Sequence, residues 1–263
     1  MMSCTALPVG DGSRSWVPRA LAALLLCLAA LQPAVAQTVL RLARIENIPD
    51  QAVGAELLRE VYRRAGVAVE FVDLPAKRAL VESSSGRLDG EVHRIFDVQR
   101  EFPTLIALQP PINQIEPTVF SRGLRFPVAG WDSIRPYSIG IVRGVGSSER
   151  GTQGMARVEP VASMEQLMTM LDGGRFEVAV NDRFSGLLVN RRLRLETRVL
   201  PLAPPLETLQ LHHFLHERHR ALLPRIEAEL RAMQASGELA RLRQGIMDKM
   251  LDDAQRSPPD HGR

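Results

Sequence analysis

Two arginines that could bind a carboxylate, Arg94 and Arg100, lie in the stretch LDGEVHRIFDVQR. The apolar alternation of Leu88, Gly90 and Val92 predicts the end of a buried strand just before the first of them. In an open α/β sheet, ligands bind beyond the carboxyl ends of the strands. Because a guanidinium group can bond both oxygens of a carboxylate at once, this stretch predicts a site for a carboxylate-bearing ligand.

Two further candidate segments lie in the second half of the chain. The run FEVAVND predicts a strand that ends at Asp182, an aspartate that could also cap the helix expected to follow it. The glycine-rich turn RGVGSSERG contains Gly146, Ser147 and Ser148 and leads into a helix. Free backbone N–H groups at such a turn suit a carboxylate, although the serines could equally be ordinary N-caps.

The first 36 residues have the pattern of a signal peptide. Arg14 and Arg19 precede an apolar run at 20–31, and AVA at 34–36 supplies the small residues before a cleavage site. The run is too short to span a membrane, which takes roughly 20 apolar residues. We therefore expect cleavage after Ala36 and export to the periplasm.

Composition narrows the class of the exported chain. A formal charge of +3, from 33 basic and 30 acidic residues, gives no reason to expect a nucleic-acid partner. Both cysteines, Cys4 and Cys27, fall in the predicted leader, so the mature chain has neither a disulfide nor a thiol nucleophile. No later segment is long and apolar enough to span a membrane, so we expect a soluble product.

Strands and helices are expected to alternate along the mature chain. Strands are expected near 39–45, 67–72, 88–92, 137–142, 158–161, 176–182 and 208–215. Helices are expected near 49–65, 75–81, 164–171, 184–193, 219–235 (bent at Pro224) and 239–250. The α/β alternation implies parallel pairing, and the proline-punctuated segments 103–122 and 201–205 interrupt it.

These interruptions predict an α/β fold of two Rossmann-like lobes joined by a two-strand hinge. The expected divisions are a signal peptide at 1–36, a first part of lobe one at 37–118 and lobe two at 119–207. The chain then returns to lobe one at 208–252 and ends in a disordered tail at 253–263. Hinged lobes of this kind close around a ligand.

At this level of detail the chain resembles the type II periplasmic solute-binding proteins, in particular the polar-amino-acid-binding branch of ABC importers. The markers are PAKRALVESSSGRLDGEV, WDSIRPYSIGIVRGVG, GGRFEVAVND and LLPRIEAELRAMQASGELARL, which together cover nearly the whole mature chain. The resemblance implies that Arg100 grips the ligand's α-carboxylate and that Asp182 takes its α-ammonium. It also implies carboxylate contacts from the loop at 144–148 and a pocket position for Glu46 or Asn47.

The chain departs from the family pattern at two places. His93 and Arg94 replace small polar residues after the lobe-one strand, and the serines of the lobe-two loop are displaced along it. An additional guanidinium in the cleft should reject cationic side chains, which favours a neutral or acidic amino acid or a small dicarboxylate. We expect a monomer that delivers this solute to a membrane permease, with no cofactor and no metal.

Several residues carry alternative interpretations. Arg94 could pair with Glu91 or Asp97, and Arg78, on a helix that faces the cleft in this family, could instead pair with Glu82 at helical spacing. The histidines at 212, 213, 216 and 219 are interpreted as structural or surface residues, because no cysteine or carboxylate spacing completes a metal site.

Two other functional classes share this fold. One is an exported dehydratase, for which Glu46 and His93 are the candidate acids or bases. The other is a sensory module that reports its ligand state to a membrane receptor. The sequence does not separate the second of these from import.

Overall fold

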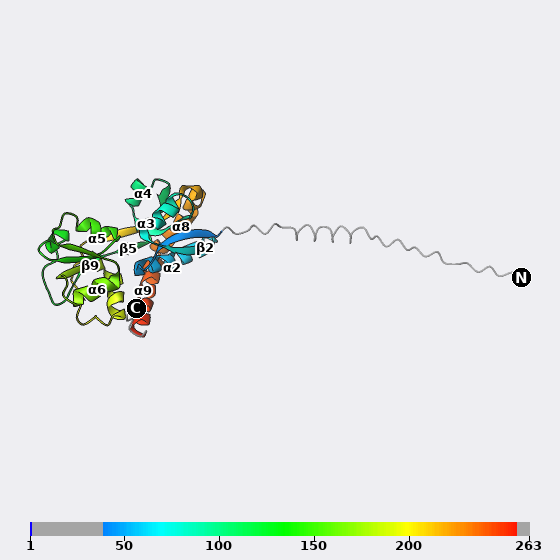
Figure 1. The fold of residues 1–263 in the computed structure, drawn as a ribbon. Coiled ribbons are helices and arrows are strands. Elements are labelled where there is room, and N and C mark those ends of the chain that lie inside the picture. Colours follow the sequence, from blue (N-terminus) through cyan, green and yellow to red (C-terminus); the bar gives the residue numbers. More distant parts are fainter. Residues whose placement is uncertain (2–38, 257–263) are drawn as a thin grey trace. The chain divides into compact units, whose positions relative to one another are not determined.

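The computed structural model describes residue 1 and residues 39–256 (Figure 1). Two units divide the chain, Met1–Gln37 and Thr38–Arg263, and the two lobes both belong to the second unit. The predicted signal peptide and most of the predicted tail lie outside the described residues. Within residues 39–256, no helix combines the length and the apolar character needed to cross a bilayer.

The first lobe is built on a mixed sheet in the order β2-β1-β3-β11-β4, with β5 also paired to β11. β1 runs parallel to β2 and β3, whereas β11 is antiparallel to β3, β4 and β5. Its strands are β1 (Leu40–Ile45), β2 (Val69–Leu74), β3 (Gly90–Ile95), β4 (Leu105–Ala107), β5 (Asn113–Ile115) and β11 (Leu209–His216).

Helices from both ends of the chain complete this lobe. They are α2 (Pro49–Arg64), α3 (Ala76–Ser84), α4 (Val98–Glu101), the 3-10 helix η2 (Glu217–Leu222), α8 (Leu223–Ala235) and α9 (Glu238–Arg256). α2 begins at a proline, whose missing N–H costs nothing in a first turn. It ends before Gly66, which has a φ of +60° that favours glycine.

The second lobe is built on a five-stranded sheet in the order β10-β6-β9-β7-β8. Its elements are β6 (Pro117–Ser121), η1 (Trp131–Ile134), β7 (Ile139–Val142), α5 (Gly146–Gly151), β8 (Val158–Val161), α6 (Met164–Asp172), β9 (Val178–Asp182), α7 (Arg183–Arg192) and β10 (Leu200–Pro201). β7 is parallel to β8 and β9, so their carboxyl ends meet at one edge. That edge carries the loop before α5 and the start of α7.

The chain crosses between the two sheets twice. The strands beside these crossings, β5 and β11, pair with each other in antiparallel register. Helix packing also joins the lobes. Phe184 and Leu188 of α7 belong to the same apolar cluster as Leu57 of α2 and Leu230 of α8. Because α9 packs against α2, α7 and α8, it contributes to both lobes near the hinge.

The structure corrects several sequence-based boundaries. β3 continues to Ile95, so Arg94 lies within the strand, opposite His212 of β11, and not beyond its end. The predicted bend at Pro224 is a helix start, because η2 precedes it and Pro224 occupies the first turn of α8. α9 continues to Arg256, beyond the predicted end at 250 and into the predicted tail.

Candidate functional site

Asp182 lies where the second lobe meets the hinge. It is the last residue of β9 and the N-cap of α7, and its Oδ2 accepts a hydrogen bond from the Ser185 N–H at 3.0 Å. Its Oδ1 accepts one from the N–H of Glu116, next to β5, also at 3.0 Å. Burial raises the pKa of Asp182, although these two N–H groups oppose the effect. The predicted capping role is confirmed, and one carboxylate thus contacts both α7 and the hinge.

The first lobe places a second acid, Asp50, close enough to Asp182 for the charge of Asp182 to raise its pKa. Asp50 is in the first turn of α2 and is 9% exposed. Burial, and next the negative charge of Asp182, raise the pKa of Asp50 to about 8. Ile48, just before α2, packs against the lobe-two apolar cluster that contains Val142 and Met168. The beginning of α2 therefore lies against the second lobe.

His93 connects Asp50 to the floor of lobe one. Its Nδ1 is 3.2 Å from the side-chain nitrogen of Gln51, and its Nε2 is 3.2 Å from the backbone oxygen of Asp50. Burial lowers the pKa of His93 to about 4, so it is neutral at neutral pH. Of the two candidates that the sequence suggests for a dehydratase, His93 is therefore a buried, neutral ring with both nitrogens engaged, whereas Glu46 is exposed.

Arg243 of α9 fixes the first crossing strand. Its Nε donates to Oδ1 of Asn113 at 2.7 Å, and its Nη2 donates to the Gln114 carbonyl at 3.1 Å. Its positive charge lowers the pKa of both Asp50 and Asp182. The hinge strand is therefore held by Arg243 on one side and, through Glu116, by Asp182 on the other.

The Arg94 side chain donates hydrogen bonds to one residue of its own strand and to one residue of α3. Its Nε donates to Oε2 of Glu91 at 2.8 Å, and its Nη2 donates to the Ala76 carbonyl at 3.0 Å. The side chains of Arg94 and Glu91 are 11% and 0% exposed. Burial raises the pKa of Glu91, while Arg94 opposes the effect. The predicted alternative of a pair with Glu91 is confirmed, and this pair stabilises Arg94 at a buried position.

The other predicted lobe-one residues are on the surface. Arg100, in α4, has a side chain that is 81% exposed and lies 3.3 Å from Asp97. Arg78 is 69% exposed and lies 3.8 Å from Glu82, the pairing that helical spacing predicts. Glu46 is exposed after β1. Exposed pairs of this kind contribute little to stability, so Arg100 and Arg78 lose little by turning toward a ligand.

The lobe-two loop is ordered around a short helix. Gly144 has a φ of +83°, and its N–H donates to Oε1 of Glu149 at 2.8 Å. Val145 is the N-cap of α5, with no side-chain hydrogen bond, so neither serine caps the helix. Ser147 and Ser148 are buried, whereas Gly146 is exposed.

The four clustered histidines have separate partners. His213 lies 2.7 Å from the hydroxyl of Tyr62 and 2.7 Å from the Glu91 carbonyl, and burial lowers its pKa to about 4. His212 contacts the Leu108 carbonyl, His216 accepts from a backbone N–H of η2, and His219 pairs with Asp89. Among the described residues, no group of three or more His, Cys, Asp or Glu side chains is placed to hold a metal ion.

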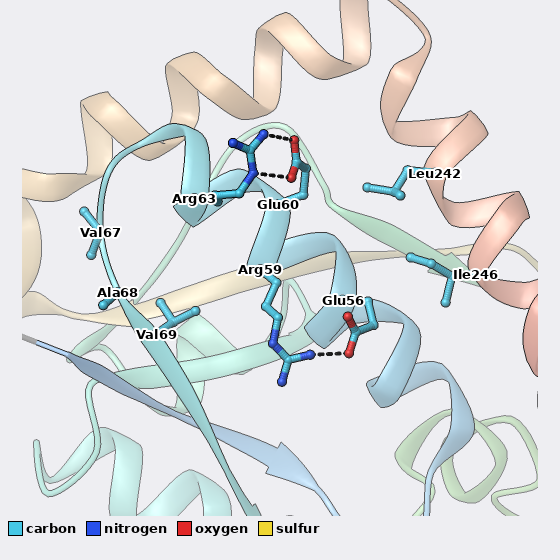
Figure 2. Close-up of a pocket in the computed structure, with 9 residues that line it drawn as sticks. All are labelled: Glu56, Arg59, Glu60, Arg63, Val67, Ala68, Val69, Leu242 and Ile246. Atoms are coloured by element: carbon cyan, nitrogen blue, oxygen red, sulfur yellow. Dashed lines mark hydrogen bonds and ion pairs between the residues drawn. The ribbon is translucent and has the colours of Figure 1, made fainter.

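A cavity of about 610 Å³ lies elsewhere in lobe one (Figure 2). Apolar residues from the start of β2 and from α9 line it, together with a face of α2. The charged groups on that face pair with one another, Arg59 with Glu56 and Arg63 with Glu60. It contains none of the predicted site residues.

Comparison with solved structures identifies the architecture. A histidine kinase sensor domain similar to periplasmic binding proteins matches with a TM-score of 0.65 and 20% identity, over 80% of this chain and 96% of that chain. The GluR0 ligand-binding core in complex with L-glutamate matches with a TM-score of 0.67 and 15% identity, over 82% and 99%. The fold is that of the type II periplasmic binding proteins.

The remaining comparisons add one more structure of the same fold and one sequence relative. An ancestral arginine-binding protein bound to glutamine matches with a TM-score of 0.62 and 15% identity, over 80% of this chain and 95% of that chain. A protein from Shewanella oneidensis, itself described as uncharacterized, is 22% identical over 199 residues, or 72% of this chain and 74% of its own length. No family model matches the chain.

Sequence reasoning did not identify Asp50 or Arg243 as members of the site. An acid in the first turn of a helix is ordinarily explained by the helix dipole, and an arginine on a long polar helix by solvation. Only the pairing of distant segments shows that both lie near Asp182.

Proposed function

We propose that this protein is an exported binding protein whose two lobes close on a small carboxylate-bearing solute, a neutral or acidic amino acid. The observation that carries the proposal is the position of Asp182, a partly buried acid of lobe two whose carboxylate accepts a hydrogen bond from Glu116 at the hinge. A carboxylate at this place suits the ammonium group of an amino acid. Two solved structures of the same fold are complexes, one with L-glutamate and the other with glutamine.

For the ligand's carboxylate, we propose the lobe-one arginines and the lobe-two loop at 144–148. The Arg100 side chain is 81% exposed and pairs with the exposed Asp97, whereas Arg94 already binds Glu91 and Ala76 through two of its nitrogens. We propose Arg78, Glu46, Gly146, Ser147 and Ser148 as further contacts, in keeping with the family resemblance. Transfer of the bound solute to the permease of an ABC importer completes the proposed role.

Calorimetric titration of the purified protein tests the proposal. The ligands are the twenty standard L-amino acids, with succinate and glutarate as acids that lack an ammonium group. We expect one neutral or acidic amino acid to bind at one site per chain. Asp182→Asn retains a capping side chain but removes the charge, so affinity should fall by about 30-fold or more.

A matched control separates this loss from a general effect of removing an acid. Asp132 of lobe two has an 84% exposed side chain and pairs only locally with Arg135, so Asp132→Asn should bind like wild type. If no ligand in the panel binds, or if Asp182→Asn binds undiminished, the proposed site is wrong.

A sensory role is the second candidate, because one of the matching structures is a histidine kinase sensor domain. Both roles require the same ligand site. Deletion of the gene distinguishes them, since an import protein is needed for uptake of the radiolabelled amino acid, whereas a sensor is needed for a transcriptional response to it.

A further inference from the structure

The carboxylate of Asp50 is buried without a cationic partner of its own. The residue is 9% exposed, and the nearest group in an ion-pair geometry is Nε2 of His93, 3.6 Å from its Oδ2. That ring is neutral at neutral pH because burial lowers the pKa of His93 to about 4. Within the described part of the chain, no other side chain donates a hydrogen bond to this carboxylate. A buried carboxylate without a cationic partner is stabilised either by binding a proton or by a positively charged donor from a ligand.

The acid that acts most strongly on Asp50 is Asp182, on the other lobe. After burial, the charge of Asp182 is the largest cause of the raised pKa of Asp50. Ile48 packs on the apolar cluster of lobe two, which fixes the first turn of α2 against that lobe. The two acids therefore lie on different lobes, at the starts of α2 and α7, two helices that pack against each other.

The neighbouring cations do not neutralise this pair. Arg243 from α9 and Arg94 from β3 both lower the pKa of Asp50, yet it remains raised, at about 8. Each guanidinium is bonded elsewhere, Arg243 to Asn113 and Arg94 to Glu91. Two nearby carboxylates in a desolvated place cannot both be ionised cheaply, so the pair retains a proton.

We propose that Asp50 and Asp182 together form a site for a single positive charge, filled by a proton in the empty protein and by the ammonium group of the ligand in the complex. This inference rests on the proposed function and makes it more specific. The ligand must be an amine as well as a carboxylate, and Asp50 is a residue that determines this specificity. When R-NH₃⁺ enters, the acid proton leaves to solvent, and no covalent bond of the ligand changes.

Proton release provides the test. Titrations of the best-bound L-amino acid, with L-glutamine tried first, are run at pH 7 in phosphate and in Tris, whose ionisation heats differ. Wild type should release close to one proton, and its affinity should rise about tenfold from pH 6 to pH 7 and level off above about pH 8. In Asp50→Asn, release should fall close to zero and affinity should become independent of pH across this range.

Controls keep the result interpretable. Asp132→Asn should release the same proton as wild type. If Asp50→Asn does not unfold cooperatively, Asp182→Asn removes the charge that acts on Asp50 and should lower the number of protons released per bound ligand. Absence of proton release by wild type, or unchanged release in the variant, overturns the inference while amino-acid binding itself still stands.

A ligand-free measurement separates failure of this inference from failure of the proposed function. A raised acid pKa means that the folded state holds a proton the unfolded state lacks, so stability falls as pH rises toward about 8. Between pH 6.5 and 7.5, the unfolding constant of wild type in urea should rise about eightfold relative to that of Asp50→Asn. An equal pH dependence in the two proteins overturns the shared proton, whether or not any amino acid binds.

Discussion

Removal of Arg94 alone should destabilise the protein strongly, because it leaves the buried carboxyl group of Glu91 without its cationic partner. The two side chains are 11% and 0% exposed, and the Nε–Oε2 distance is 2.8 Å. Breaking a buried pair by removing one partner costs about 3–5 kcal/mol. For a domain of this size, that corresponds to a fall in Tm of roughly 6–20 °C. Arg94→Ala should therefore unfold at a much lower urea concentration than wild type.

A double-mutant cycle assigns this loss to the pair. Glu91→Gln removes the buried charge, so Arg94→Met combined with Glu91→Gln should recover much of the stability lost in Arg94→Met alone. Arg100→Ala is the matched control, since its exposed pair with Asp97 contributes at most about 1 kcal/mol. A urea midpoint for Arg94→Ala equal to that of Arg100→Ala would refute the reasoning. Binding losses in Arg94 variants are meaningful only after this measurement.

Three further predictions concern a buried histidine, a glycine packed against His93 and a helix cap in lobe two. Burial lowers the pKa of His213 to about 4, whereas its unfolded pKa is about 6.5. The contribution of the neutral histidine to stability is therefore complete above about pH 6.5 and is lost as the pH falls toward 4. His213→Gln should reduce the slope of the unfolding free energy against pH, measured by urea titration, by up to about 1.4 kcal/mol per pH unit. Gly54→Ala would place a Cβ 2.1 Å from Cδ2 of His93 and should cost about 1–3 kcal/mol, whereas Gly245→Ala, with no atom within 4 Å, should be neutral or stabilising in the same thermal melts. Ser163→Ala removes the N-cap of α6 and should cost about 1 kcal/mol, with Ser163→Asp close to wild type in chemical denaturation.

The sequence predicts the two-lobe architecture well because its signals are local. Pro49 and Gly66 mark the ends of α2, and the run FEVAVND forms β9 with Asp182 at its end, as its pattern predicts. Helix α6 likewise buries the apolar face that its spacing indicates. Each of these features depends on neighbours within a few residues, which a sequence displays directly.

The site is harder to predict because its energetics are non-local. A charge within a strand pattern ordinarily signals a loop, and Arg94 remains in β3 because Glu91 and the Ala76 carbonyl satisfy it. Asp50 gains its significance from Asp182, far along the chain. Such relations arise only after the two lobes are packed together.

Closure of the two lobes on an amino acid is the central claim, and a distance measurement tests it most directly. Because the only cysteines of the sequence are Cys4 and Cys27, protein that begins at residue 37 is free of native thiols. Nitroxide labels at Ser85→Cys in lobe one and Gln153→Cys in lobe two, both exposed positions, report the separation by pulsed electron paramagnetic resonance. We expect a saturating amino acid to shift the distances to a shorter and narrower distribution, and Asp182→Asn to prevent the shift at the same concentration. An unchanged distribution in wild type at saturation would contradict the account.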